Sequence, residues 1–187
     1  MKKIYPTLLL SCWFGLAFAQ PTITTNELPT AGTAWTTAND SVYITSMLPG
    51  GANQTWDYSG LMNYFIDTLG FGQSIGTPYS GDYPTSNLAS YNQASGSWSY
   101  YTSNSSGLYL DGLVDPAFGI VNLTPSLLYV PVPFTYGNTR SSSSGFQIDT
   151  LLGTTNARIN IDFQSQFEAD GYGTVLLPNR SEEHTSE

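Results

Sequence analysis

Polar and apolar residues alternate over residues 156–168, and this alternation limits what the chain can fold into more than any other feature. A period of two places successive side chains on opposite faces of a β-strand. One parity is polar or charged throughout, and the other is apolar apart from Ser165. The segment is therefore predicted to be a long strand with one buried and one solvated face. Its apolar residues are Ala157, Ile159, Ile161, Phe163 and Phe167.

Weaker alternation predicts further strands along the chain. Residues 103–107 are expected to join two of them as a hairpin, and Ser59-Gly60 is expected to join an earlier pair. Pro131 and Pro133 remove two donors from the strand that contains them, which predicts an edge strand or an extended crossing. The predicted strands are residues 54–58, 64–69, 98–102, 108–114, 128–136, 146–152 and 172–177.

Turn-forming residues separate these strands at short intervals. Clusters of Gly, Pro and Ser at 49–51, 76–78, 80–82 and 141–145 predict turns, and residues 75–97 are expected to be rich in loops. No segment has the periodicity of an amphipathic helix. The fold class is therefore predicted as all-β, a single antiparallel β-sandwich or jelly-roll-like domain whose C-terminal strands are missing.

The first nineteen residues have the pattern of a secretory signal peptide. Lys2 and Lys3 precede an apolar run that ends in small residues, so cleavage is expected before Gln20. Cys12 leaves open a lipoprotein alternative, in which it would carry a lipid anchor. The run is too short to cross a bilayer, and no later segment is apolar enough to do so. We expect an exported protein, secreted or on the outer cell surface.

The last eight residues, 180–187, match the translation of a common sequencing adapter. Such a tail is excluded from reasoning about the fold. The native domain is then predicted to be residues 20–179, and the natural protein is expected to continue beyond Asn179. This exclusion also removes His184, the only histidine of the chain.

Charge excludes one class of partner. The formal net charge is −9, and Arg140 and Arg158 are the only bases between residues 20 and 179. Such a surface repels phosphate, so nucleic acid is not expected as a partner. The single cysteine, Cys12, lies in the predicted signal peptide, and no disulfide is expected in the mature chain.

Four segments carry a resemblance to a known group. Residues 28–32, 51–59, 133–137 and above all 169–179 resemble the N-terminal β-domain of uncharacterised secreted Bacteroidota proteins, the kind that the type IX secretion system exports. The resemblance implies contact with the export machinery and a location outside the cell. It implies no activity. The C-terminal sorting domain of that group would follow Asn179.

The sequence contains one catalytic motif, but the residues that must act with it are missing. Residues 72–76 match G-x-S-x-G around Ser74, but no helix is predicted after it and no native histidine could act as base. Without Cys or His, a typical zinc site is excluded. An enzyme is not favoured, and no catalytic residue is assigned.

Acidic and aromatic residues give the candidate ligand sites. If Asp111 and Asp115 lie on one strand, their carboxylates are roughly 13 Å apart, which is too far for the two catalytic carboxylates of a glycosidase. Most acidic residues are expected at the solvated surface. Calcium needs only oxygen ligands, so Asp82, Asp111 and Asp115 are its candidates, and no other cofactor is expected. Trp98 and Tyr100 share a parity and are assigned to the core. The candidate ligand-binding residues are Tyr101, Asp111 and Asp115.

Three segments, 40–42, 67–69 and 149–151, resemble the O-glycosylation sequon of exported Bacteroidota proteins. Their acceptors would be Ser41, Thr68 and Thr150. Export, β-structure and the lack of common catalytic residues together predict a non-catalytic binding, adhesion or structural domain, with an extracellular glycan or protein as its partner. The alternative is a carbohydrate-active enzyme or its accessory carbohydrate-binding module.

Overall fold

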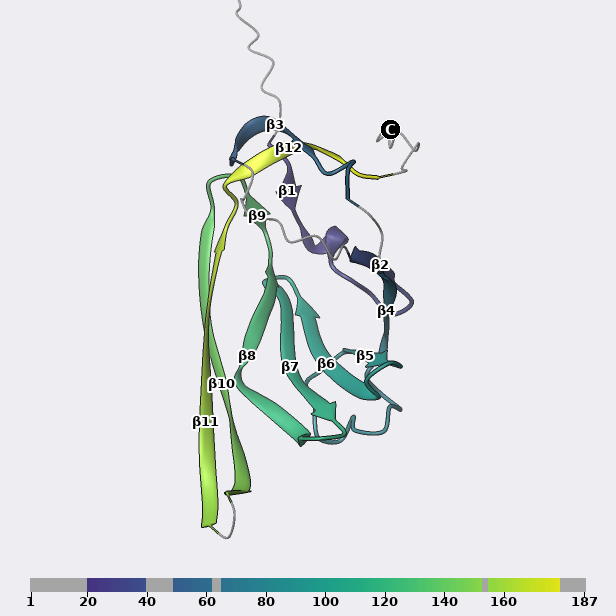
Figure 1. Ribbon diagram of the computed structural model, residues 1–187, viewed down its shortest axis with the longest axis vertical. Helices are drawn as coiled ribbons and strands as arrows, with labels where there is room; N and C mark the ends of the chain where they lie inside the picture. The colour runs from purple at the N-terminus through teal and green to yellow at the C-terminus, as the bar shows by residue number, and fades with distance from the viewer. Residues whose placement is uncertain (1–19, 40–48, 62–64, 153–154, 179–187) are drawn as a thin grey trace, which may run out of the picture.

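A computed structural model describes residues 20–39, 49–61, 65–152 and 155–178. Twelve strands and one 3₁₀ turn make up the described chain, which confirms the all-β, sandwich-like class (Figure 1). The elements are β1 (Thr22–Ile23), η1 (Thr25–Glu27), β2 (Ala34–Asn39), β3 (Gly51–Asp57), β4 (Phe65–Gln73), β5 (Leu88–Asn92), β6 (Ser97–Asn104), β7 (Gly107–Asp115), β8 (Gly119–Pro131), β9 (Phe134–Thr135), β10 (Thr139–Leu152), β11 (Thr155–Glu168) and β12 (Gly171–Leu176).

Six antiparallel strands form the central sheet, in the order β2-β4-β5-β6-β7-β8. The hairpin predicted around residues 103–107 is present, with Asn104 paired to Gly107. β8 lies at the edge of the sheet and ends at Pro131, and the chain then crosses to β9, which pairs with β1. The edge position is therefore confirmed for the strand that ends at Pro131, but the single strand predicted over residues 128–136 is wrong, because the chain leaves the sheet before Pro133.

Each face of the central sheet carries a buried cluster, because a short segment covers part of it. Tyr100 and Tyr101 are consecutive in β6 and point to opposite faces. On one face, Tyr101 packs with Leu28, Phe71, Leu88, Leu108 and Val132. On the other face, Tyr100 packs with Tyr83, Ala89 and Val114. Tyr83 belongs to the loop between β4 and β5, so this loop acts as a cover for the sheet.

The strands β10 and β11 form one long hairpin beside β8 (Figure 1). The hairpin extends past the end of the central sheet. The turn predicted at residues 141–145 is wrong, because all five residues lie inside β10. Serine and glycine there are accommodated because β10 pairs with β11 along its whole length, so tertiary pairing overrides their weak strand preference.

A pairing predicted from the sequence is also wrong. β3 does not pair with β4 across Ser59-Gly60. Instead β3 pairs in parallel with β12, whereas β4 pairs with β2 and β5. Proximity in sequence favoured the hairpin, but β11 runs back along the domain, and β12, which follows it, lies beside β3 (Figure 1). The final strand predicted at 172–177 is present as β12.

Candidate functional site

Tyr101, predicted to bind a ligand at the surface, lies in the core. Its side chain is 5% exposed, and its ring makes an edge contact with Phe71 at 5.5 Å between centroids. Burial raises the pKa of its phenol. Alternation along this strand suggested one solvated face, but both faces are covered. Tyr101 is therefore inaccessible as a stacking platform.

Asp111 is also buried, which corrects its assignment to a solvated surface site. It is 8% exposed and accepts hydrogen bonds from three hydroxyl groups. Ser86 and Thr102 donate to Oδ2 at 2.6 and 2.7 Å, and Ser126 donates to Oδ1 at 2.6 Å. These donors come from the β4–β5 loop, β6 and β8. Since a buried carboxylate must be hydrogen-bonded, Asp111 joins four segments of the fold rather than offering a free ligand group.

The other two candidate calcium ligands lie in turns. Asp115 is half-buried at the end of β7, where Oδ1 accepts from the backbone N–H of Ala117 at 2.8 Å. Asp82 is exposed in the β4–β5 loop. Among the residues that the structure describes, no three acids, histidines or cysteines are grouped so that they could share a metal ion.

Ser74 of the G-x-S-x-G segment is buried just after β4. Its hydroxyl donates to the carbonyl oxygen of Ser86, and its carbonyl accepts from the Thr77 hydroxyl at 2.6 Å. A run of turns follows Ser74, where a nucleophile elbow would require a helix. The Ser74 hydroxyl thus links the beginning of the β4–β5 loop to its end at Ser86.

Of the three predicted glycosylation acceptors, Thr68 is exposed on β4 and pairs with Thr36 on β2. Thr150 lies in β10, where its backbone pairs with Ala157. Ser41 lies outside the described residues, as do the predicted signal peptide and the tail at 180–187.

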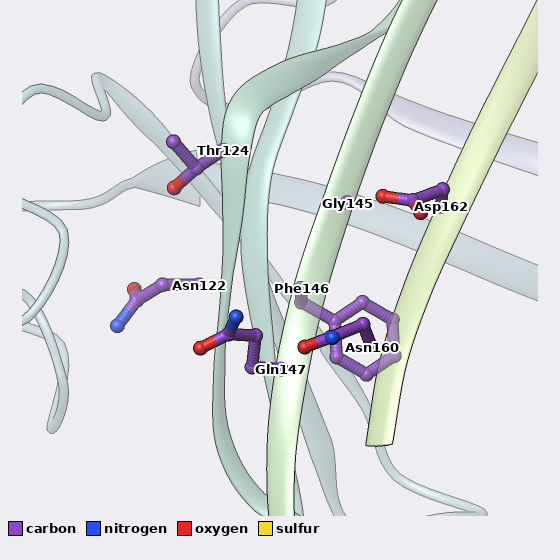
Figure 2. A pocket seen from close by; sticks show the side chains of 7 residues that line it. All are labelled: Asn122, Thr124, Gly145, Phe146, Gln147, Asn160 and Asp162. Atoms are coloured by element: carbon purple, nitrogen blue, oxygen red, sulfur yellow. The ribbon is translucent and has the colours of Figure 1, made fainter. Parts of the chain in front are cut away.

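The structure shows a groove that the sequence did not predict, between β8 and the β10–β11 hairpin (Figure 2). It has a volume of about 610 Å³. Each of three strands contributes to its wall. The lining residues are Asn122 and Thr124 from β8, Gly145, Phe146 and Gln147 from β10, and Asn160 and Asp162 from β11.

Register places the polar groups of the groove in cross-strand pairs. Gln147 faces Asn160, and Gly145 faces Asp162. Gly145 leaves the space that Asp162 uses, because a Cβ at residue 145 would lie 2.8 Å from Asp162 Oδ1. In Figure 2 the Gln147 amide reaches from β10 toward β8, and Asp162 points toward Gly145. A single glycine inside a strand pattern is the one sequence signal that could have indicated this close approach.

Neutral polar chemistry dominates the groove. Three amides and one hydroxyl supply both donors and acceptors, and Asp162 is the one ionisable lining residue. Phe146 precedes Gln147 in β10, so its ring turns to the other face of the hairpin, where it stacks on Phe163. No basic residue is among these lining residues, so the groove offers an anion no charged partner.

The described chain has one ion pair, which lies on the same hairpin. Arg158 Nε and Nη2 donate to the two carboxylate oxygens of Asp149 at 2.7 and 3.1 Å. This bidentate contact lowers the pKa of Asp149 and raises that of Arg158. Both side chains are exposed, so the pair contributes little to stability.

Within its described ranges, the chain has no helix long and apolar enough to cross a membrane. Comparisons with protein-family models, with curated proteins and with solved structures found no match.

Proposed function

We propose that the chain is an exported, non-catalytic binding module that holds a neutral saccharide in the groove between β8 and the β10–β11 hairpin. The observation that carries this proposal is the lining of the groove. Asn122, Gln147 and Asn160 present amides, each of which can donate to one sugar hydroxyl and accept from another.

Two features support binding over hydrolysis. Glycoside hydrolysis usually requires two carboxyl groups on either side of the scissile bond, whereas the described lining of the groove holds one, Asp162. The buried carboxylate of Asp111 is already held by three hydroxyl donors. The pattern of residues 1–19 supports an export route, and the acidic composition favours uncharged ligands over phosphate.

Glycan-array screening of the purified protein, followed by calorimetry with the strongest ligand, tests the proposal. Gln147→Ala and Asn122→Ala each remove one amide from the groove, and each should weaken binding about three- to tenfold through the loss of a hydrogen bond. Gln73→Ala is the matched control, because Gln73 is exposed on β4, away from the groove.

Binding that is unchanged in both groove variants would overturn the site. Silence across the array would overturn the saccharide as ligand. Release of reducing sugar from a bound polysaccharide would instead support the carbohydrate-active enzyme.

A further inference from the structure

The outer edge of β11 has no partner strand in the part of the chain that the structure describes. β11 pairs with β10 on one side only, through an unshifted ladder from Thr139–Glu168 to Leu152–Thr155. Of the two hairpin strands, β10 is the one that lies beside β8. In Figure 1 the strands cross, and β11 is the outer strand in the lower part of the hairpin. Natural edge strands are usually interrupted by proline, a bulge or an inward-pointing charge. β11 contains no proline, and its ladder contains no bulge.

One face of β11 is also incompletely covered. The parity predicted to be buried includes Ile159, which is 41% exposed, and Phe163, which is 37% exposed. Phe163 stacks on Phe146 of β10 at 5.8 Å between ring centroids, so the apolar surface continues across the hairpin. An additional strand at the edge would extend this surface and cover its rim.

We propose that β11 pairs antiparallel with β11 of a second copy of the chain, centred on Asn160, to form a four-stranded sheet with the order β10-β11-β11-β10. With a two-fold axis through Asn160, each residue before 160 in one copy pairs with the residue equally far after 160 in the other copy. The interface is then isologous, as expected for the commonest symmetric dimers.

Charge complementarity selects this register. Arg158 lies opposite Asp162 of the second copy, and the two-fold axis repeats the pair. Within its own hairpin Arg158 already binds Asp149, so in the dimer its guanidinium would lie between two carboxylates. The Arg158 and Asp162 side chains belong to the solvated parity of β11, so they share a face. Asp162 lies opposite Gly145 on its own hairpin and has no side chain facing it there. Opposite charges directly across an antiparallel pair stabilise it, and like charges destabilise it.

The apolar parity fits the same register. Ile159 lies opposite Ile161 of the second copy, and Ala157 lies opposite Phe163, so a small residue meets a large one. A competing register could place Arg158 opposite Glu168, but Ile161 would then face Ser165. Of these two registers, only the one centred on Asn160 places Arg158 opposite an acidic residue and also places Ile159 opposite Ile161.

Sedimentation velocity over a range of micromolar concentrations tests the pairing. We expect the wild-type chain to dimerise. Arg158→Glu alone and Asp162→Lys alone each place like charges across the axis and should weaken the dimer at least tenfold. Combining the two exchanges the charges, and the double variant should recover most of the affinity.

Two controls keep the result specific. Glu168→Lys should leave dimerisation unchanged, and a loss there would show the competing register. Asp149→Asn removes the carboxylate that holds Arg158 within its own hairpin, so the dimer should stay as strong or become stronger. Far-UV circular dichroism checks that each variant is folded. A wild-type chain that stays monomeric, or a folded double variant that stays as weak as the single variants, would overturn the proposal.

Asn160 and Asp162 also line the groove, whereas Arg158 does not, so Arg158→Glu tests the dimer without changing the lining of the groove. Sedimentation also needs no saccharide. The dimer proposal and the proposed binding function can therefore fail independently.

Discussion

The ring of Tyr83 lies against the main chain of β7 at Gly112, where the strand carries no side chain. A methyl group at Gly112 would overlap both this ring and the carbonyl oxygen of Val121. The phenol donates to the carbonyl oxygens of Leu113 at 2.9 Å and Val121 at 3.0 Å. The ring also stacks on Tyr100 at 4.4 Å between centroids. Through Tyr83, a loop residue thus seals one face of the central sheet.

Gly112→Ala should destabilise the protein by about 1–3 kcal/mol, because the neighbouring ring and backbone must move to admit the methyl group. Urea unfolding measures the change as a lower midpoint. Gly81→Ala is the matched control, since a Cβ there meets no atom within 4 Å and the loop should tolerate it. Equal midpoints for the two variants would contradict the close contact between Tyr83 and Gly112.

Stability should fall as the pH rises from 10 to 12. Burial, reinforced by the charge of Asp82, raises the pKa of Tyr83 from 10.0 to about 12. In this window the folded state keeps the phenolic proton, whereas the unfolded state releases it. The unfolded state then binds fewer protons, so the free energy of unfolding decreases by up to about 1.4 kcal/mol per pH unit.

Tyr83→Phe isolates this contribution from the other tyrosines. The stability difference between wild type and variant should be constant below pH 10 and shrink between pH 10 and 12. Urea titrations at several pH values provide the measurement. A difference that stays constant to pH 12 would show that Tyr83 ionises equally in both states.

Asp111→Asn should destabilise the protein by about 1–3 kcal/mol. The substitution replaces a carboxylate that accepts from three hydroxyls by an amide with one acceptor oxygen, and buried donors are left poorly satisfied. Thermal unfolding compared with Asp82→Asn gives the measurement, because Asp82 is exposed and its variant should melt like the wild type. If both variants melt alike, the hydroxyl cluster does not stabilise the fold.

Gly173→Ala should separate β12 from β3. A Cβ at Gly173 would overlap the backbone of Gln54, so the parallel pair cannot close around it. Hydrogen exchange followed by mass spectrometry should show lost protection in β3 and β12, with β5 to β8 unchanged. Gly60→Ala serves as control, because open space surrounds that position. If the β12 amides of this variant stay protected from hydrogen exchange, the close approach of Gly173 to the Gln54 backbone is contradicted.

Strand periodicity was sufficient to predict that β6, β7 and β11 are strands and that the class is all-β, because alternation follows from the strand backbone. The buried face predicted for residues 156–168 is wrong, because the apolar side chains of β11 are half-buried or exposed. Periodicity was insufficient for Tyr101, since a pattern cannot show that both faces of β6 are covered. The cover on the second face comes from the β4–β5 loop, whose Tyr79 and Tyr83 have no regular period.

Asp111 and the groove depend on contacts between distant segments. Nothing in the sequence around Asp111 indicates that hydroxyls from Ser86 and Ser126 converge on it. The groove likewise requires β8 to lie beside the hairpin, a packing that no local pattern encodes. The parallel partner of β12 was missed for the same reason, since sequence proximity suggested a hairpin for β3.

The pairing of β3 with β12 also sets an order of events for folding. The meander from β5 to β8 and the β10–β11 hairpin join neighbours in sequence, and such contacts close short loops at low entropic cost. Gly51 can meet Gly171 only after the whole intervening stretch has been synthesised. The central meander should therefore consolidate first, and the β3–β12 pair should close last, as a slow final step that protease protection in β12 would time.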